Sequence, residues 1–273
     1  MMSNEKLQRS LFYIDMNDNE KINVQEQIKR IILKITCKDL SGWLYSISED
    51  KHVLVKDSHG ELIKPLFLNM VVDSLCKTHK KLIFEPFIKG DTTTSPETRI
   101  NSFFARNSEQ YIKTYRNIKD KIKIIPGDYE YAQPKHHEYH DYIKTRFSIN
   151  PKIAAEIIED VNTILFYGSE HMVKRGIGYN IDSGIPDYLP DDSYIILQAL
   201  DFSNLYYANK KFIIDTVKKL DIFDKDDKTA IYIIPSRVEI DHPSYYIIFN
   251  ICSSEEKADT PLTIAWEDAE DVD

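Results

Sequence analysis

Apolar residues recur along the first part of the chain with two spacings, and each spacing predicts a different kind of element. Between residues 24 and 35 they fall on one stripe of a 3.6-residue repeat, which predicts a helix with one core-facing side. Residues 43–47 and 52–55 alternate apolar and polar positions on either side of a polar turn, which predicts a hairpin. With a helix at 66–76 and a short strand at 82–84, residues 1–125 are expected to form a mixed α+β part.

The pattern becomes more regular after residue 150. Pro151 suits the first turn of a helix, and Asn150 stands where a cap would stand. The order of the predicted elements, strand, helix, strand and hairpin, favours an α/β layer with a largely parallel sheet, because crossover strands are normally parallel. The predicted elements are a helix at 151–162, strands at 164–167 and 194–200, a helix at 209–220 and a terminal hairpin of 230–234 and 245–252.

Proline and glycine mark a boundary in the middle of the chain. Pro126, Gly127, Pro134 and Pro151 punctuate a polar stretch, which predicts a connector at 126–150. The predicted organisation is a mixed α+β part at 1–125, this connector, an α/β part at 151–264 and an acidic tail at 265–273.

Charge divides the chain in the same place. The whole sequence has a net charge of -9, but residues 1–150 hold 24 Lys and Arg against 20 Asp and Glu, whereas residues 151–273 hold 11 against 24. A polyanion would therefore bind the first part.

Composition excludes several classes of protein. With 42% hydrophobic residues, 17 Tyr and 12 Phe, the 273-residue chain has enough apolar surface to fold rather than stay disordered. No apolar stretch approaches the roughly 18 residues of a membrane span, so no membrane partner is expected. The three cysteines, Cys37, Cys76 and Cys252, form no CxxC pair and predict reduced thiols in a cytoplasmic protein.

A basic segment at 99–123 is a candidate nucleic-acid interface. Its cations would neutralise phosphates, and exposed aromatic rings between them would stack on bases. The alternative is an amphipathic helix whose aromatic residues are buried and whose cations are solvated. The candidate contact residues are Arg99, Arg106, Tyr111, Lys113, Tyr115, Arg116, Lys119, Lys121 and Lys123.

The C-terminus carries five acidic residues among its last seven. Such a tail competes with nucleic acid for a basic groove or recruits protein partners, and in composition it is similar to the tails of single-stranded DNA-binding proteins. A plain solubilising terminus explains the same residues.

A histidine cluster is the candidate metal site. His136 and His140 are four residues apart, so a helix would present both imidazoles on one side, and His137 lies between them. The pattern is not HExxH, and a further ligand would come from a distant residue such as His171 or His242. Surface histidines in a polar connector are the alternative.

Residues 15–26 partly match an EF-hand calcium loop. Asp15, Asn17, Asn19 and Glu26 stand at oxygen-ligand positions, but Glu20 occupies the place where the sharp turn needs glycine. The alternative is that Asn23 caps a helix that begins at residue 24.

Three residues of the second part fit a nucleotide-type cofactor site. Gly168 follows a predicted strand, and Asp182 and Asp201 stand where a ribose-binding or metal-binding carboxylate would stand in methyltransferase-like or nucleotidyltransferase-like enzymes. The GxGxxG loop and the paired DxD of those families are absent.

The sequence therefore leaves two function hypotheses open and assigns no cofactor. The leading one is an intracellular accessory or interaction protein that binds single-stranded nucleic acid or a protein partner, with the acidic tail as modulator. The other is an enzyme with a Rossmann-like cofactor site or a histidine-rich metal site.

Overall fold

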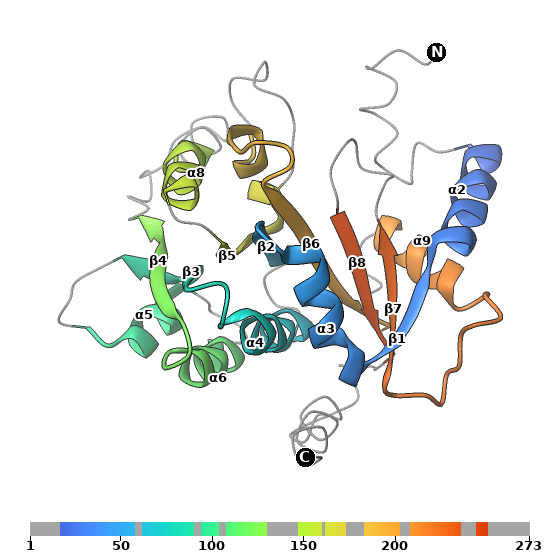
Figure 1. The fold of residues 1–273 in the computed structure, drawn as a ribbon, viewed down its shortest axis with the longest axis horizontal. Helices are drawn as coiled ribbons and strands as arrows, with labels where there is room; N and C mark the ends of the chain where they lie inside the picture. The colour runs from blue at the N-terminus through green and yellow to red at the C-terminus, as the bar shows by residue number, and fades with distance from the viewer. Residues whose placement is uncertain are drawn as a thin grey trace. The chain divides into compact units, whose positions relative to one another are not determined.

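The chain forms helices and strands in a mixed α/β order (Figure 1). The computed structural model describes residues 17–57, 62–89, 94–103, 108–129, 147–159, 162–172, 183–202, 208–235 and 244–250. The described α-helices are α2 (Asp18–Ile31), α3 (Cys37–Ser48), α4 (Ile63–Leu75), α5 (Pro96–Phe103), α6 (Ser108–Ile118), α8 (Asn150–Ile158) and α9 (Ala208–Val217), with short 3-10 helices η2 (Ser169–Met172) and η3 (Ile185–Tyr188).

In the described part of the chain, eight strands form one mixed sheet in the order β1-β7-β8-β6-β2-β5-β3-β4. The pairs β2–β5, β5–β3 and β3–β4 are parallel, whereas β1–β7 and β7–β8 are antiparallel. The predicted α/β class is therefore confirmed. The strands are β1 (Leu33–Thr36), β2 (His52–Asp57), β3 (Lys81–Lys89), β4 (Lys123–Tyr129), β5 (Thr163–Gly168), β6 (Tyr194–Asp201), β7 (Ala230–Pro235) and β8 (Ser244–Phe249).

The chain divides into two compact units, residues 41–196 and residues 1–40 with 197–273. The predicted connector 126–150 lies inside the first of these, and β4 occupies its first residues. The strands that flank the connector in the sequence, β4 and β5, both pair with β3.

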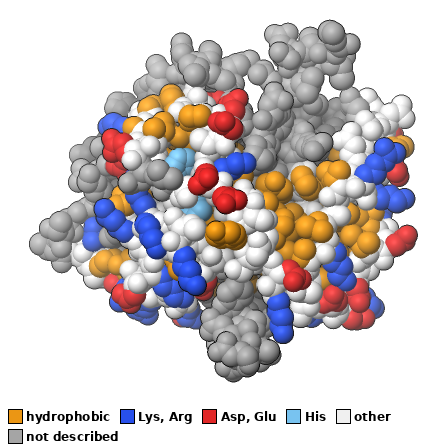
Figure 2. Space-filling model, viewed as in Figure 1, with side chains coloured by type: hydrophobic (Ala, Val, Ile, Leu, Met, Phe, Trp, Pro, Cys, Tyr) orange, Lys and Arg blue, Asp and Glu red, His pale blue; other side chains and the backbone are white. Residues whose placement is uncertain are grey.

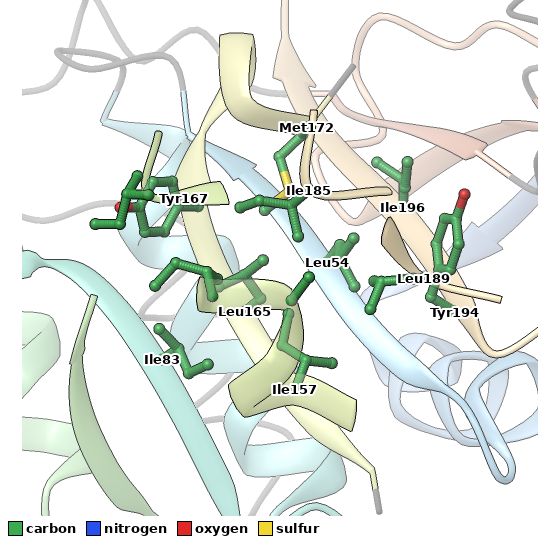
Figure 3. Close-up of a cluster of buried hydrophobic side chains, with 13 residues drawn as sticks. Leu54, Ile83, Ile157, Leu165, Tyr167, Met172, Ile185, Leu189, Tyr194 and Ile196 are labelled. Carbon is green, nitrogen blue, oxygen red and sulfur yellow. The ribbon is translucent and has the colours of Figure 1, made fainter. Parts of the chain in front are cut away.

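Unit 41–196 is built on the parallel ladder of β2, β5, β3 and β4. Strand residues alternate between the two sides of a sheet. Leu165 and Tyr167 of β5 pack with Ile153 and Ile157 of α8 on one side (Figure 3). On the other side, the ring of Phe166 contacts that of Tyr111 from α6, with 6.2 Å between centroids. The ladder is thus covered on both sides, which explains why every residue of β5 is buried.

The other unit has its own core around the antiparallel strands. Ile28 of α2 and Val217 of α9 pack with Tyr232 of β7 and Ile248 of β8. The register of β7 and β8 pairs Ile233 with Ile247, so the predicted terminal hairpin has antiparallel strands as expected.

The predicted helix at 24–35 is displaced toward the N-terminus. Helix α2 begins at Asp18, so Asn23 lies inside it and does not cap it. Residues 18–26 of the partial EF-hand match lie in this regular helix and do not form a calcium loop, and Asp15 lies outside the described residues. Leu33–Thr36 is strand β1 rather than helix, since it pairs with β7, a partner almost 200 residues away.

The predicted hairpin at 43–55 is half wrong. Residues 43–47 belong to α3, in which Leu40, Leu44 and Ser48 are buried at a spacing of four residues. A four-residue spacing fits one side of a helix, and the short apolar–polar alternation at 43–47 was compatible with both structures. The second half, β2, is a strand as predicted.

The amino ends of the parallel strands enclose two histidines. Nδ1 of His52 accepts a hydrogen bond from the backbone amide of Thr163 at 3.1 Å, and Nε2 of His79 lies 2.9 Å from the carbonyl oxygen of Lys51. Burial, together with the charges of His79 and Lys81, lowers the pKa of His52 to about 4. Burial also lowers the pKa of His79. Both rings are therefore neutral at pH 7.

No helix among the described residues is long and apolar enough to cross a membrane. Cys37 and Cys76 are free thiols, and Cys252 lies outside the described residues.

Substituting Gly127→Ala is expected to destabilise the fold by about 1–3 kcal/mol. A Cβ at this position of β4 would lie 2.8 Å from backbone atoms of Glu85, closer than packed atoms allow. The free energy of unfolding is measured by urea denaturation. Gly42→Ala is the control: a Cβ there meets nothing within 4 Å. Because Gly42 lies in helix α3, alanine should stabilise by about 0.5–1 kcal/mol. Equal effects of the two substitutions would contradict the close approach at Gly127.

The free energy of unfolding is expected to fall as the pH drops from about 6.5 to about 4. Unfolded His52 takes up its proton near pH 6.5, whereas folded His52 does so only near pH 4. His52→Asn keeps an oxygen acceptor for Thr163 but does not titrate, so its stability should depend less on pH, by up to about 1.4 kcal/mol per pH unit in this window. Urea denaturation at several pH values measures both slopes, and identical slopes would disprove the assignment to His52.

Candidate active site

Polar side chains gather where the parallel strands end. Asp57 is the last residue of β2, Glu85 lies in β3, and His171 follows β5 in η2; their exposed fractions are 1%, 3% and 0%. The carboxyl ends of parallel strands meet at one edge of a sheet, where α/β proteins place their ligand sites. Burial of three ionisable groups at this edge makes it the candidate site.

Glu85 is tied to the end of β5. Its carboxylate accepts a hydrogen bond from the backbone amide of Gly168. On the neighbouring strand, the carbonyl oxygen of Gly127 accepts a hydrogen bond of 2.9 Å from the hydroxyl group of Tyr167. The close approach of Gly127 to Glu85 thus places β4 next to the residue that binds the carboxyl end of β5.

Asp57 lies on the other side of β5. The register of β2 and β5 places Asp57 opposite Gly168. The hydroxyl group of Tyr111 donates to both carboxylate oxygens of Asp57, at 2.9 and 3.0 Å. Asp57 and Glu85 therefore flank the carboxyl end of β5, one through strand pairing and the other through a hydrogen bond.

His171 is held by contacts on several sides of its ring. Nδ1 lies 2.7 Å from Oδ1 of Asn150, and the centroids of the Phe147 and Tyr167 rings lie 4.9 and 5.0 Å from that of the imidazole. Asn150 also donates from Nδ2 to the carbonyl oxygen of Ser183 at 2.7 Å. Asn150 was predicted to cap the following helix, but the cap residue is Ile149, whose side chain makes no capping hydrogen bond.

The predicted metal and cofactor residues are only partly described. His136, His137, His140 and Asp182 lie outside the described residues. Gly168 is at the candidate site, but its amide already donates to Glu85. Among the described residues, no group of three or more His, Cys, Asp and Glu side chains is arranged to hold a metal ion.

Asp201, the remaining predicted cofactor residue, ends β6 and is buried. It belongs to the unit formed by residues 1–40 and 197–273, whereas the candidate site lies in unit 41–196.

The basic segment at 99–123 folds into α5, α6 and β4, and Arg106 lies outside the described residues. Tyr111 is buried against Asp57 and does not reach solvent, so it is not placed to stack on a base; Tyr115 is half-buried. Among the cations, Lys113 pairs with Glu109, Arg116 with Glu97 and Lys121 with Asp73; Lys119 and Lys123 are exposed, and Arg99 lies in α5. On the face drawn in Figure 2, acidic and basic side chains are interspersed over this region.

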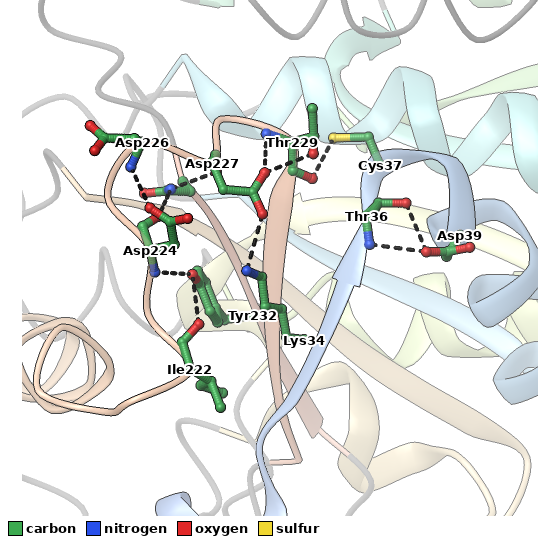
Figure 4. Close-up of polar contacts among 11 residues, drawn as sticks. Lys34, Thr36, Cys37, Asp39, Ile222, Asp224, Asp226, Asp227, Thr229 and Tyr232 are labelled. Atoms are coloured by element: carbon green, nitrogen blue, oxygen red, sulfur yellow. Dashed lines mark hydrogen bonds and ion pairs between the residues drawn. The ribbon is translucent and has the colours of Figure 1, made fainter.

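A second polar cluster lies in the loop before β7 (Figure 4). The carboxylate of Asp227 accepts hydrogen bonds from Thr229 and forms an ion pair with Lys34 at 3.0 Å. The hydrogen bond from the Thr229 hydroxyl lowers the pKa of Asp227 most, and the bond from Lys34 lowers it further. The same bond to Asp227 raises the pKa of Lys34. Asn250 donates to the carbonyl oxygens of Asp224 and Asp227, both at 2.6 Å. These contacts close the loop on itself, so the cluster has a structural role.

Sequence reasoning missed Asp57, Glu85 and the role of Asn150. A signal for the two acids was present: Glu85 directly follows the apolar run Leu82–Phe84, and Asp57 follows the run Val53–Val55 after one intervening residue, Lys56. Acids at or just beyond the end of such runs are expected at the carboxyl edge of a parallel sheet. No sequence signal indicated that Asn150 would reach His171.

Substituting Tyr111→Phe is expected to lower the free energy of unfolding by about 1.5–3 kcal/mol at pH 7, because buried Asp57 loses a hydrogen bond to a charged group. Urea denaturation measures the loss. Tyr45→Phe is the control, since Tyr45 is about half exposed in α3, and its effect should stay within about 0.5 kcal/mol. A loss no larger than that of the control would contradict the Asp57–Tyr111 bond.

Comparison with known proteins gives no family for the chain. No protein-family model matches it, and no curated protein matches it significantly. A solved structure described as "Bacterial protein toxins" is similar over 72% of this chain and 42% of its own, with 15% identity and a TM-score of 0.44. The chain thus spans less than half of that structure, and a similarity at this level carries no functional conclusion.

Proposed function

We propose that the protein is an enzyme, and specifically a hydrolase, whose active site is the carboxyl edge of β2, β5 and β3. One observation carries the proposal: Asp57, Glu85 and His171 are buried around the end of one strand of a parallel ladder. Burying ionisable groups costs free energy, and active sites are where such groups are gathered. A purely structural cluster would be served as well by apolar residues of similar volume.

The proposed reaction uses His171 as the general base and acid. His171 takes a proton from water as the water oxygen attacks the scissile bond, and it returns a proton to the leaving group. Water is thereby added across the bond, with no oxidant or reductant. The carboxylates of Asp57 and Glu85 would attract the developing imidazolium and accept hydrogen bonds from hydroxyl or amino groups of a substrate.

This proposal develops the enzyme hypothesis of the sequence and moves its centre to the end of β5. Gly168 stays part of it, as the donor that holds Glu85. Binding of nucleic acid through 99–123, modulation by the tail 265–273 and a cytoplasmic location stay predictions. The free thiols of Cys37 and Cys76 support the proposed cytoplasmic location.

Hydrolysis of three chromogenic substrates tests the proposal: p-nitrophenyl acetate, bis(p-nitrophenyl) phosphate and p-nitrophenyl β-glucoside. The wild-type protein is expected to hydrolyse at least one, and His171→Gln should lower kcat about 10²–10⁴-fold by removing the base. Glu85→Gln should also lower kcat, because the charge beside the end of β5 is lost. Absorbance of the released nitrophenolate gives the rates.

His52→Asn is the matched control, since it also replaces a histidine, but one that is partly buried and lies at the opposite edge of the ladder. It should retain the wild-type kcat. Hydrolysis of none of the substrates, or an equal loss in His52→Asn and His171→Gln, would contradict the proposal.

A further inference from the structure

The side-chain amide of Asn150 is fully buried, and both its nitrogen and its oxygen make polar contacts. Asn150 is the first residue of α8, one position after the cap residue Ile149, so it does not cap the helix. Instead, Nδ2 donates to the carbonyl oxygen of Ser183 and Oδ1 lies 2.7 Å from Nδ1 of His171. The side chain thus joins three segments of unit 41–196: α8, η2 and the residues that precede η3.

The contact with Ser183 fixes which way the amide points. A backbone carbonyl oxygen only accepts hydrogen bonds, so the NH₂ group of Asn150 must face Ser183 and the amide oxygen must face the imidazole. An amide oxygen also only accepts. The hydrogen between Oδ1 and Nδ1 therefore belongs to His171.

We propose that Asn150 is the positioning residue of the site and holds His171 in the tautomer with hydrogen on Nδ1, so that Nε2 carries the lone pair. That Nε2 acts as the base rests on the proposed function; the tautomer itself does not. In a catalytic or metal-binding histidine, the hydrogen bond made by one ring nitrogen determines the tautomer, and the tautomer determines whether the other nitrogen can react. Asn150 is the group that makes this bond here.

The surrounding rings support a fixed orientation of the imidazole. The planes of Phe147 and His171 meet at 40°, and those of Tyr167 and His171 at 77°. Tyr167 is itself held by its hydroxyl bond to Gly127. A rotation of the imidazole by half a turn about its Cβ–Cγ bond would break the 2.7 Å contact with Asn150 and disturb the packing against these rings.

The wild-type protein gives the first test. Two-bond ¹H–¹⁵N correlation spectra of the full-length protein with ¹⁵N-labelled histidine, recorded at pH 8, separate protonated from unprotonated ring nitrogens. The signals missing from His171→Gln belong to His171. We expect a protonated Nδ1 and an unprotonated Nε2. A ring protonated only on Nε2, or on both nitrogens, overturns the inference.

Variants of Asn150 provide the second test. Asn150→Asp retains an oxygen acceptor toward Nδ1 and should keep the hydrogen there. Asn150→Leu has a similar volume but no acceptor, so the Nδ1–H signal should be lost in favour of Nε2–H. Asn117→Leu, on the exposed side of α6, should leave the His171 spectrum unchanged. If Asn150 serves only to link segments, Asn150→Leu lowers stability but keeps the hydrogen on Nδ1, and the inference fails.

The spectra and the hydrolysis assay fail independently. The tautomer needs no substrate, so absence of hydrolysis with a protonated Nδ1 would reject the hydrolase and leave the role of Asn150 intact. Hydrolysis that depends on His171, together with a ring protonated on Nε2, would support the hydrolase and reject the role of Asn150. If the Asn150 variants do not fold, the wild-type spectrum still decides.

Discussion

The carboxylate of Glu85 accepts a hydrogen bond from the backbone amide of Gly168, and the rest of the candidate site depends on this contact. A buried amide at the end of a strand needs an acceptor, and a buried carboxylate needs donors. The bond therefore gives the amide its acceptor and the carboxylate one of its donors. The chain turns at this point from β5 into η2, which brings His171 beside Tyr167 and Asn150. Gly127 belongs to the same arrangement, because only a residue without a side chain lets β4 pass so close to Glu85.

The chain has two acidic clusters that differ in burial, and this difference is the basis for giving one a structural role and proposing a catalytic role for the other. Asp224, Asp226 and Asp227 lie in a turn, where they bond to nearby backbone groups and Asp227 pairs with Lys34. An exposed ion pair of this kind contributes about 0–1 kcal/mol, and the cluster is explained by loop closure. Asp57 and Glu85 are buried on neighbours of β5, where keeping a charge out of water is costly. That cost is the reason for proposing a catalytic role for Asp57 and Glu85.

Helix α6 explains why one segment supported two hypotheses. Tyr111, Thr114 and Ile118 form its buried side, whereas Lys113 and Arg116 are exposed on the other. A pattern of cations with interleaved aromatic residues fits a nucleic-acid interface and an amphipathic helix equally well. The buried side extends to Asp57, so this segment contributes directly to the candidate site. Its exposed cations lie near acids that reduce the charge available to a phosphate.

The sequence by itself determined the elements whose periodicity is strong and local. Helices α4 and α9, strands β5 and β6 and the terminal hairpin lie close to their predicted positions, since each contains a local run of apolar residues of the length that the element needs. Tertiary structure decided the short elements: β1 is a strand because β7 pairs with it, and residues 43–47 are helical because Leu44 lies with Leu40 and Ser48 on the buried side of α3.

Tertiary structure also decided the site. Asp57, Glu85, Asn150 and His171 are spread over 115 residues, and only the parallel pairing of β2, β5 and β3 brings their segments to one edge. Asn150 shows the limit of local reasoning most clearly. Its place before Pro151 is typical of a helix cap, but hydrogen bonds to Ser183 and His171, residues more than 20 positions away, determine where its amide points. Local sequence sets the backbone conformation of a segment, whereas the partner of a buried polar side chain is set by whichever group the fold brings within reach.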